Sequence, residues 1–225
     1  YWLSQAIYVA AKLEIADLLA AGPRTTADLA SATGTHERSL YRMLRALASV
    51  GVFNEVGPRT FALNEVADPL RRDAPGSQWA MAVMMGEEHY QAWGELLYSI
   101  QTGQGSFRKV FGEGVFDFLG KHPEQAKVFD AAMTSIHGKE TALVLDVYDF
   151  GQFPVLCDVG GGNGNTLATT LQRHPKIRGI LFDLPHVVER AKPNVQQQNV
   201  ADRCQFVGGN FFAKIDVLHG ATVDT

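Results

Sequence analysis

The sequence has few cysteines, no excess of basic charge and no long apolar run. Cys157 and Cys204 are its only cysteines and lack the paired spacing of a zinc site, so we interpret both as reduced, buried thiols. The formal net charge is −4, which gives no overall basic field to attract nucleic acid or an anionic membrane. No segment approaches the ~20 apolar residues that a membrane-spanning helix requires, and the N-terminus resembles no signal peptide. We therefore expect a soluble, cytoplasmic protein.

Residues 1–70 are predicted to form a winged helix. Thr25 and Asp28 have the spacing of a capping box that opens one helix, and Gly34 ends it. The apolar side chains of a second helix recur at helical spacing: Leu40, Met43, Leu44 and Leu47. Residues 51–63 then read as two short strands around a Gly-Pro turn.

The first helix, within residues 1–19, is apolar nearly all round, which is typical of a helix buried on every side. A small N-terminal unit cannot bury it alone, so we expect a homodimer formed through the N-terminal helices. DNA binding is the rival function, because Arg38, Arg42 and Arg45 on the second predicted helix could meet phosphates. The same arginines also suit a solvated face, which the acidic net charge favours, so we expect no nucleic-acid and no membrane partner.

Residues 71–150 are predicted to be helical and rich in aromatic side chains. Pro123 suits the first turn of a helix. On that helix an apolar face is formed by Phe129, Ala132, Met133 and Ile136. Such a face suits either core packing or the wall of a ligand pocket.

Residues 151–225 change to strands alternating with helices. Apolar runs at 153–159, 177–184 and 204–212 predict the strands of a parallel sheet that is covered on both faces. Helices are predicted between them, at 165–174 and 185–199. The expected fold class is therefore α/β, with a doubly wound Rossmann-like sheet preceded by an all-α winged-helix domain.

A glycine cluster follows the first of these strands. Asp158, Gly160, Gly162 and Gly164 have the spacing D-x-G-x-G-x-G, whereas a dinucleotide fingerprint would need a glycine at position 165, which is Asn165. The shorter spacing suits a ligand without a pyrophosphate, such as S-adenosylmethionine, whose carboxylate can accept hydrogen bonds from backbone N–H groups.

Two further strand ends supply groups for the rest of this ligand. Asp183 follows Gly164 by 19 residues, where a carboxylate would bind the ribose hydroxyls, although it could instead cap the next helix. At the end of the third strand, Asn210 could accept from the adenine amine and Phe211 could cover the ring. The predicted cofactor-binding residues are therefore Gly160, Asp183, Asn210 and Phe211.

Three segments, "VLCDVGGGNGN", "GILFDLPHVVERA" and "RCQFVGGNFF", resemble the cofactor motifs of S-adenosylmethionine-dependent O-methyltransferases of the caffeate and hydroxyindole type. The resemblance extends from the winged helix to about Phe212. It implies a dimerising N-terminal domain and methyl transfer to a hydroxyl of a small aromatic or polyketide-like acceptor, with S-adenosylhomocysteine as product. It also implies that Phe129 and Met133 line the acceptor pocket. The family usually has aspartate at the position of Asn210.

The implied reaction is an in-line displacement at the sulfonium methyl group. A phenol titrates near pH 10, so a histidine base assists its deprotonation, and alignment of oxygen, carbon and sulfur lowers the barrier further. His219 is the candidate base, although Gly220 follows it where the family has an acid, and it also suits an ordinary surface histidine. No cluster of carboxylates or histidines suggests a metal, so we expect none.

Two other functions compete with this interpretation. One is a transcription regulator that binds DNA through the winged helix and senses a nucleotide, and the other is the same fold using its cofactor structurally for another reaction. Residues 213–225 are too few to supply the strand and base-bearing helix that follow in the family, or to cover the other edge of the first apolar strand. We therefore expect these residues alone to have an incomplete acceptor site, weakened cofactor binding and little transferase activity, unless a partner chain completes the sheet.

Overall fold

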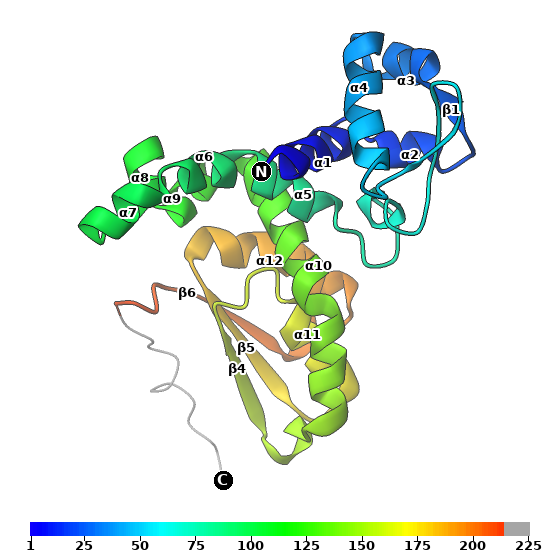
Figure 1. Cartoon of the computed structure of the whole chain (residues 1–225). Helices are drawn as coiled ribbons and strands as arrows, with labels where there is room; N and C mark the ends of the chain where they lie inside the picture. The colour runs from blue at the N-terminus through cyan, green and yellow to red at the C-terminus, as the bar shows by residue number, and fades with distance from the viewer. Residues whose placement is uncertain (214–225) are drawn as a thin grey trace. The chain divides into compact units, whose positions relative to one another are not determined.

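The computed structural model describes residues 1–213, apart from the side chains of residues 136–139 (Figure 1). The chain forms two compact units, Tyr1–Ser135 and Ile136–Thr225. The first unit is helical with a small antiparallel sheet, and the second alternates strand and helix around a parallel sheet. The α/β fold class is confirmed, while the finer boundaries at residues 70 and 150 stay predictions.

The N-terminal part of the first unit is a winged helix. Its elements are α1 (Trp2–Lys12), α2 (Ile15–Leu19), β1 (Arg24–Thr25), α3 (Thr26–Thr33), α4 (Glu37–Ala48), β2 (Asn54–Gly57) and β3 (Thr60–Ala62). As predicted, the Thr25 hydroxyl accepts from the N–H of Asp28 at 3.1 Å and caps α3, and Gly34 ends α3 in the left-handed conformation. The domain is not all-α, because β1, too short to leave a pattern in the sequence, extends the predicted hairpin to a sheet of order β1-β3-β2.

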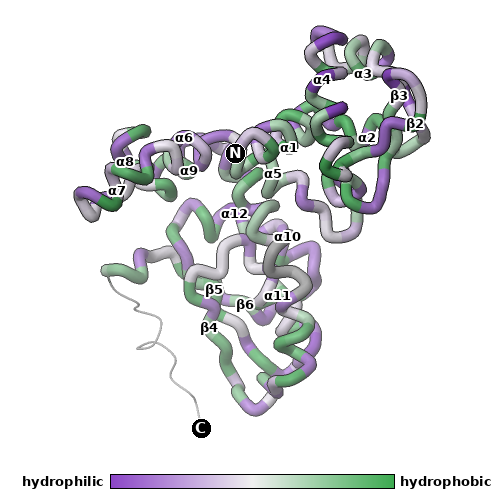
Figure 2. Tube along the Cα trace, in the orientation of Figure 1, coloured by the Kyte–Doolittle hydropathy of each residue, from purple (hydrophilic) through white to green (hydrophobic). Residues whose placement is uncertain are grey.

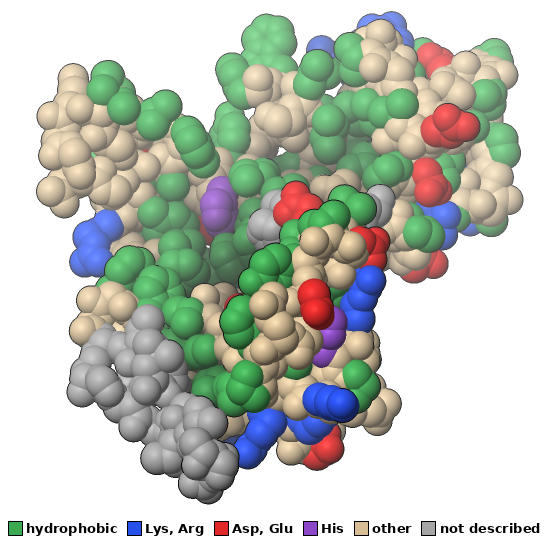
Figure 3. Space-filling model, turned by 90° about the horizontal axis from the view of Figure 1, so that it is seen from below, with side chains coloured by type: hydrophobic (Ala, Val, Ile, Leu, Met, Phe, Trp, Pro, Cys, Tyr) green, Lys and Arg blue, Asp and Glu red, His purple; other side chains and the backbone are tan. Residues whose placement is uncertain are grey.

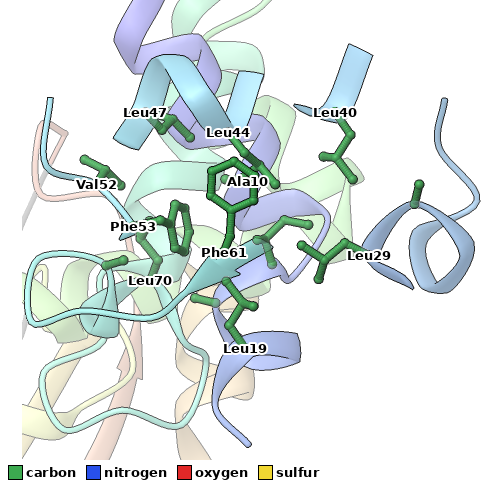
Figure 4. Close-up of a cluster of buried hydrophobic side chains, with 14 residues drawn as sticks. Ala10, Leu19, Leu29, Leu40, Leu44, Leu47, Val52, Phe53, Phe61 and Leu70 are labelled. Atoms are coloured by element: carbon green, nitrogen blue, oxygen red, sulfur yellow. The ribbon is translucent and has the colours of Figure 1, made fainter. Parts of the chain in front are cut away.

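Leucine and phenylalanine side chains from facing elements form the core of this winged helix (Figure 4). Leu44 and Leu47 of α4 are fully buried, as are Phe53 and Phe61 from the wing. The buried leucines of α4, Leu40, Leu44 and Leu47, recur every three or four residues, so one side of the helix enters this core while charged residues lie on the other (Figure 2). Each such side chain contributes about 1.5–3 kcal/mol by leaving water, which holds the wing against the helices.

The rest of the first unit is helical, as predicted. Its elements are η1 (Asp68–Leu70), α5 (Trp79–Gly86), α6 (Glu88–Gly94), α7 (Leu96–Thr102), α8 (Ser106–Phe111), α9 (Val115–Lys121) and the start of α10 (Pro123–Val147). Pro123 occupies the first position of α10. Helix α5 packs closely on α1, since a Cβ on Gly86 would lie 2.0 Å from Cγ of Tyr8.

The second unit contains a three-stranded parallel sheet in the order β4-β5-β6. After the end of α10 its elements are η2 (Phe150–Gln152), β4 (Val155–Val159), α11 (Asn165–Arg173), β5 (Arg178–Asp183), α12 (Pro185–Gln197), η3 (Ala201–Arg203) and β6 (Cys204–Gly208). Strand β5 is central and mostly buried, whereas β4 is half-buried because, within the described residues, it pairs with β5 alone. The second and third strands thus lie on one side of the first, as expected.

Helices α11 and α12 pack against the same face of this sheet. Leu167 of α11 and Val195 of α12 share one buried cluster with Leu181 of β5, while Ile180 and Phe182 point to a separate cluster on the other face. Ile180 and Phe182 on that other face are also buried, at 7% and 2% exposure, so the central strand β5 is shielded on both faces, as its apolar run predicts. Successive right-handed crossovers between neighbouring strands in one direction place their helices on one side.

Candidate functional site

The glycine turn between β4 and α11 lies at the carboxyl end of the parallel sheet. Gly160, Gly162 and Gly164 have φ angles of 74°, 56° and 76°, in the left-handed region that residues with a side chain rarely adopt. Gly161 is required for another reason, because a Cβ there would lie 2.4 Å from Cδ1 of Leu181 and 2.9 Å from Cγ of Asp158. The turn therefore presents its backbone in a conformation that glycine adopts far more readily than other residues.

Asp183 faces this turn from the end of β5. Its Oδ2 accepts from the N–H of Gly162 at 2.9 Å, and its Oδ1 accepts from the N–H of Leu184 at 2.6 Å. Helix α12 has Leu184 as its N-cap residue and receives no side-chain cap. Asp183, the predicted ribose-binding residue, thus lies beside the glycine turn. Its side chain does not cap α12, which was the alternative role.

Phe211 and Asn210 lie just beyond β6, and only the Phe211 side chain points toward the glycine turn. Cε1 of Phe211 is 3.6 Å from the position that a Cβ on Gly160 would take, so its ring lies over the glycine turn. The side chain of Asn210 is exposed, and its Oδ1 accepts from the N–H of Phe212 at 3.0 Å. The N–H of Gly209 donates to the backbone oxygen of Asp183 at 2.8 Å and ties this segment to the site.

Asp158, at the end of β4, was absent from the predicted site residues. Its Oδ2 is buried and has no hydrogen-bond partner among the described residues. Burial raises the pKa of the Asp158 carboxyl, and repulsion from Asp183 raises it further. The sequence signal was an acidic residue inside an apolar strand, since a buried carboxylate without a partner is costly and indicates a ligand group.

The predicted acceptor residues lie in the first unit, on α10. Phe129 is partly buried and bridges two clusters, one with Ala80 and Met84 of α5 and one with Phe118 of α9. Met133 packs in the first of these clusters. These contacts fit a core position as well as a pocket wall, so the acceptor role stays a prediction.

Three other sequence expectations have plain outcomes. His219, the predicted base, lies outside the described residues. Arg38, Arg42 and Arg45 are exposed on α4, which fits a solvated face and phosphate contacts alike. Cys157 and Cys204 are unpaired, as predicted, but only Cys204 is buried, whereas Cys157 is half-buried because it lies on β4, an edge strand in the part of the chain that the structure describes. Burial raises the pKa of the Cys204 thiol to about 11.

The described residues, 1–213, hold neither a metal-ligand group nor a candidate membrane span. Within that range, no three His, Cys, Asp or Glu side chains come together as a metal-ligand group. No helix in the same range has the length and apolar content needed to cross a membrane.

Comparison with known protein families divides the chain into two matched parts. Residues 1–73 match the O-methyltransferase dimerisation domain, and residues 93–218 match the O-methyltransferase domain.

Comparison with curated proteins finds relatives that act on aromatic natural products, by their names. The chain is 43% identical over 215 residues to phenazine O-methyltransferase PhzM of Lysobacter antibioticus, covering 96% of this chain and 63% of the relative. It is 37% identical over 217 residues to mitomycin biosynthesis 6-O-methyltransferase of Streptomyces lavendulae, covering 95% and 62%. It is 39% identical over 215 residues to 8-amino-8-demethylriboflavin N,N-dimethyltransferase of Streptomyces davaonensis, covering 94% and 61%. The chain thus spans less than two thirds of the length of these relatives.

Solved structures agree with these relatives. The crystal structure of LaPhzM matches with a TM-score of 0.89 at 43% identity, over 96% of this chain and 65% of that one. NcsB1 from neocarzinostatin biosynthesis, in complex with S-adenosylmethionine and 2-hydroxy-5-methyl naphthoic acid, matches with a TM-score of 0.85 at 32% identity, over 96% and 67%. Since the family match covers more than half of its residues, the chain belongs to the S-adenosylmethionine-dependent O-methyltransferase family.

Proposed function

We propose that the whole protein transfers a methyl group from S-adenosylmethionine to a hydroxyl of a small aromatic or polyketide-like acceptor. The observation that carries this proposal is the convergence of Gly160, Asp183 and Phe211, from three strand ends, on one glycine turn. The phenazine and mitomycin O-methyltransferases among the relatives support a hydroxyl acceptor. The winged helix is assigned to dimerisation rather than to DNA, because it matches the dimerisation domain of this family.

The residues of the second unit fit this cofactor. Asp183 would accept hydrogen bonds from the ribose hydroxyls, and the left-handed Gly160 lets a ligand approach the backbone without meeting a Cβ. The unpartnered Oδ2 of Asp158 would accept from the ammonium group of the amino-acid part. Phe211, which covers the turn, would pack against the adenine, and Asn210 would bind its amine once its own Oδ1 is released from Phe212.

The chain itself contributes orientation and proton transfer. Bound S-adenosylmethionine supplies a methyl group on a positively charged sulfur. Phe129 and Met133 are proposed to hold the acceptor ring, which keeps its hydroxyl oriented for attack. His219 is proposed to take the proton of that hydroxyl, because a free phenol is almost wholly protonated near neutral pH.

We also propose that the protein is a homodimer through its N-terminal unit. Large apolar side chains on α1, α6 and α7 are exposed: Trp2 by 78%, Trp93 by 63%, Leu97 by 67% and Ile100 by 76%. Figure 3 shows how freely hydrophobic side chains reach the surface of the molecule. Monomeric proteins rarely leave large apolar surface exposed, and a second copy of the chain would bury these side chains.

The first test concerns the cofactor. Wild-type protein is expected to bind S-adenosylhomocysteine in calorimetry, and Asp183→Ala is expected to bind it roughly 5- to 150-fold more weakly, the loss of one or two charge-assisted hydrogen bonds. Asp202→Ala, which removes an exposed carboxylate on η3, is the matched control and should bind normally. Binding of NAD together with no binding of either adenosyl compound would contradict the proposal.

Asp158→Asn is expected to stabilise the ligand-free protein. Folding raises the pKa of the Asp158 carboxyl above its usual value of 3.8. Such a group stabilises the folded state fully at pH values below 3.8, and this contribution is lost as the pH rises through the raised pKa. The variant should therefore unfold at a higher temperature than wild type at neutral pH, and the difference should shrink towards pH 4. It should also bind S-adenosylhomocysteine more weakly. A less stable variant with unchanged affinity would show that Asp158 has a purely structural role.

Methyl transfer by the full-length protein is expected to persist in EDTA. The leaving group is a neutral thioether, so the displacement needs no Lewis acid to stabilise it. The measurement is methyl ether formation on a hydroxynaphthoate, followed by mass spectrometry with and without chelator. Activity that is lost in EDTA and restored by magnesium would place the protein in another mechanistic class.

Leu97→Asp is expected to weaken the dimer, because a charge would enter a desolvated apolar interface. Sedimentation velocity at micromolar concentration should show wild-type dimers and a shift of the variant towards monomers. Val66→Asp is the control, since Val66 is exposed by a similar 62% but lies outside α1, α6 and α7. A wild-type monomer, or an equal shift in both variants, would refute this interface.

A further inference from the structure

A polar pair, the buried Glu88 and the half-buried His89, lies in the aromatic part of the first unit, beside the proposed acceptor residue Phe129. The ring of His89 on α6 stacks on Phe129, with centroids 6.5 Å apart and planes inclined by 19°. Its edge meets Phe107 of α8 at a centroid distance of 6.2 Å. Oε1 of Glu88 lies 3.3 Å from Nδ1 of His89, and the Glu88 side chain is only 6% exposed. Among the residues that the structure describes, Glu88 is the only charged one that is buried.

The contact with Glu88 decides which ring nitrogen of His89 carries hydrogen. When Glu88 is ionised it can only accept, so Nδ1 of His89 donates to it, and the neutral tautomer that this contact selects has its lone pair on Nε2. Within the described residues Nε2 has no hydrogen-bond partner. It is accessible to solvent, since the His89 side chain is 19% exposed. The pair therefore presents one oriented hydrogen-bond acceptor at the rim of an aromatic cluster.

The open nitrogen of His89 distinguishes it from a histidine that is fully buried in a core. In a packed core both ring nitrogens ordinarily find partners, because an unpaired polar atom among apolar side chains is unfavourable. Here the buried carboxylate holds one nitrogen while the other is left for water or a ligand. This arrangement would suit an aromatic molecule with a donor group that enters next to Phe129.

We propose that His89 determines acceptor specificity, with Nε2 accepting a hydrogen bond from a hydroxyl or ring N–H of the aromatic acceptor. This inference rests on the proposed methyl transfer and on Phe129 as an acceptor contact. The donor is a second group, distinct from the hydroxyl that is methylated, whose proton is assigned to His219. The substrate class narrows accordingly to aromatic acceptors with at least two hydrogen-bond donors. Glu88 is a positioning residue that acts through His89.

The test compares three naphthoic acids that differ only in their donors. The full-length protein, saturated with S-adenosylhomocysteine, is titrated by calorimetry with 1,4-dihydroxy-2-naphthoic acid, 1-hydroxy-2-naphthoic acid and 4-hydroxy-2-naphthoic acid. Wild type is expected to bind the dihydroxy compound roughly 5- to 150-fold more tightly than the monohydroxy compound that lacks the donor to Nε2. This factor is the effect of leaving one polar group unpaired.

Three variants separate the hydrogen bond from the packing. His89→Phe keeps a ring against Phe129 and Phe107 but removes both nitrogens, and should lose the preference. His89→Gln places an amide oxygen near the position of Nε2 and should retain part of it. Glu88→Gln can donate to Nδ1 and so permits the other tautomer, and it should weaken or reverse the preference without removing the histidine. All three should bind S-adenosylhomocysteine like wild type.

The outcomes distinguish this inference from the proposed function. A wild type without any preference, or a His89→Phe variant that keeps the wild-type preference, would overturn the His89 inference alone if S-adenosylhomocysteine still binds. A wild type that fails to bind S-adenosylhomocysteine would overturn the proposed function and this inference with it. Should His89→Phe fail to fold, the response of Glu88→Gln decides in its place.

Discussion

The hydrogen bond from the N–H of Gly162 to Oδ2 of Asp183 joins the two strand ends on which the candidate site depends. It forms because β4 and β5 are parallel and in register, which brings Val159 opposite Phe182 and lets the N–H of Gly160 donate to the Phe182 oxygen at 2.8 Å. The left-handed φ angle of Gly162 then points its N–H at the carboxylate. A side chain at this position would strain that conformation, and the turn would no longer present its backbone to a ligand.

Negative charge is concentrated where this turn meets the sheet. Asp158 and Asp183 end neighbouring strands, and the carboxyl of Asp158 has a raised pKa because it is desolvated and repelled by Asp183. Two carboxylates close together are unfavourable for a protein by itself. They become favourable beside a ligand that carries an ammonium group and hydroxyl donors. The electrostatic repulsion in the free protein would therefore be relieved when the proposed cofactor binds.

The first unit separates its apolar and polar groups in a different way. Its winged helix has a fully apolar core around Phe53 and Phe61, whereas the helices that follow enclose the Glu88–His89 pair among aromatic rings. Apolar side chains such as Trp2 and Ile100 instead lie on the outside. A buried carboxylate and exposed apolar surface are the reverse of what stability alone favours. The first supports our proposal on acceptor binding, and the second supports our proposal on dimerisation.

The sequence alone determined the features that arise from local chemistry. The cap at Thr25, the end of α3 at Gly34, the wing, the order of strands and helices after residue 150 and the glycine turn all follow from side-chain period, capping and backbone freedom over a few residues. Asp183 was also predictable, because its distance from the turn along the chain reflects one strand–helix–strand repeat.

Tertiary structure alone decided how distant groups meet. Only the packed sheet shows that α11 and α12 share one face, and that Oδ2 of Asp158 is buried without a partner. The local turn that occupies Oδ1 of Asn210, and the meeting of His89 with Phe129 across two helices, likewise left no periodic trace. Such features depend on the burial and direction of individual side chains. Contacts between distant elements determine both, and local sequence patterns do not.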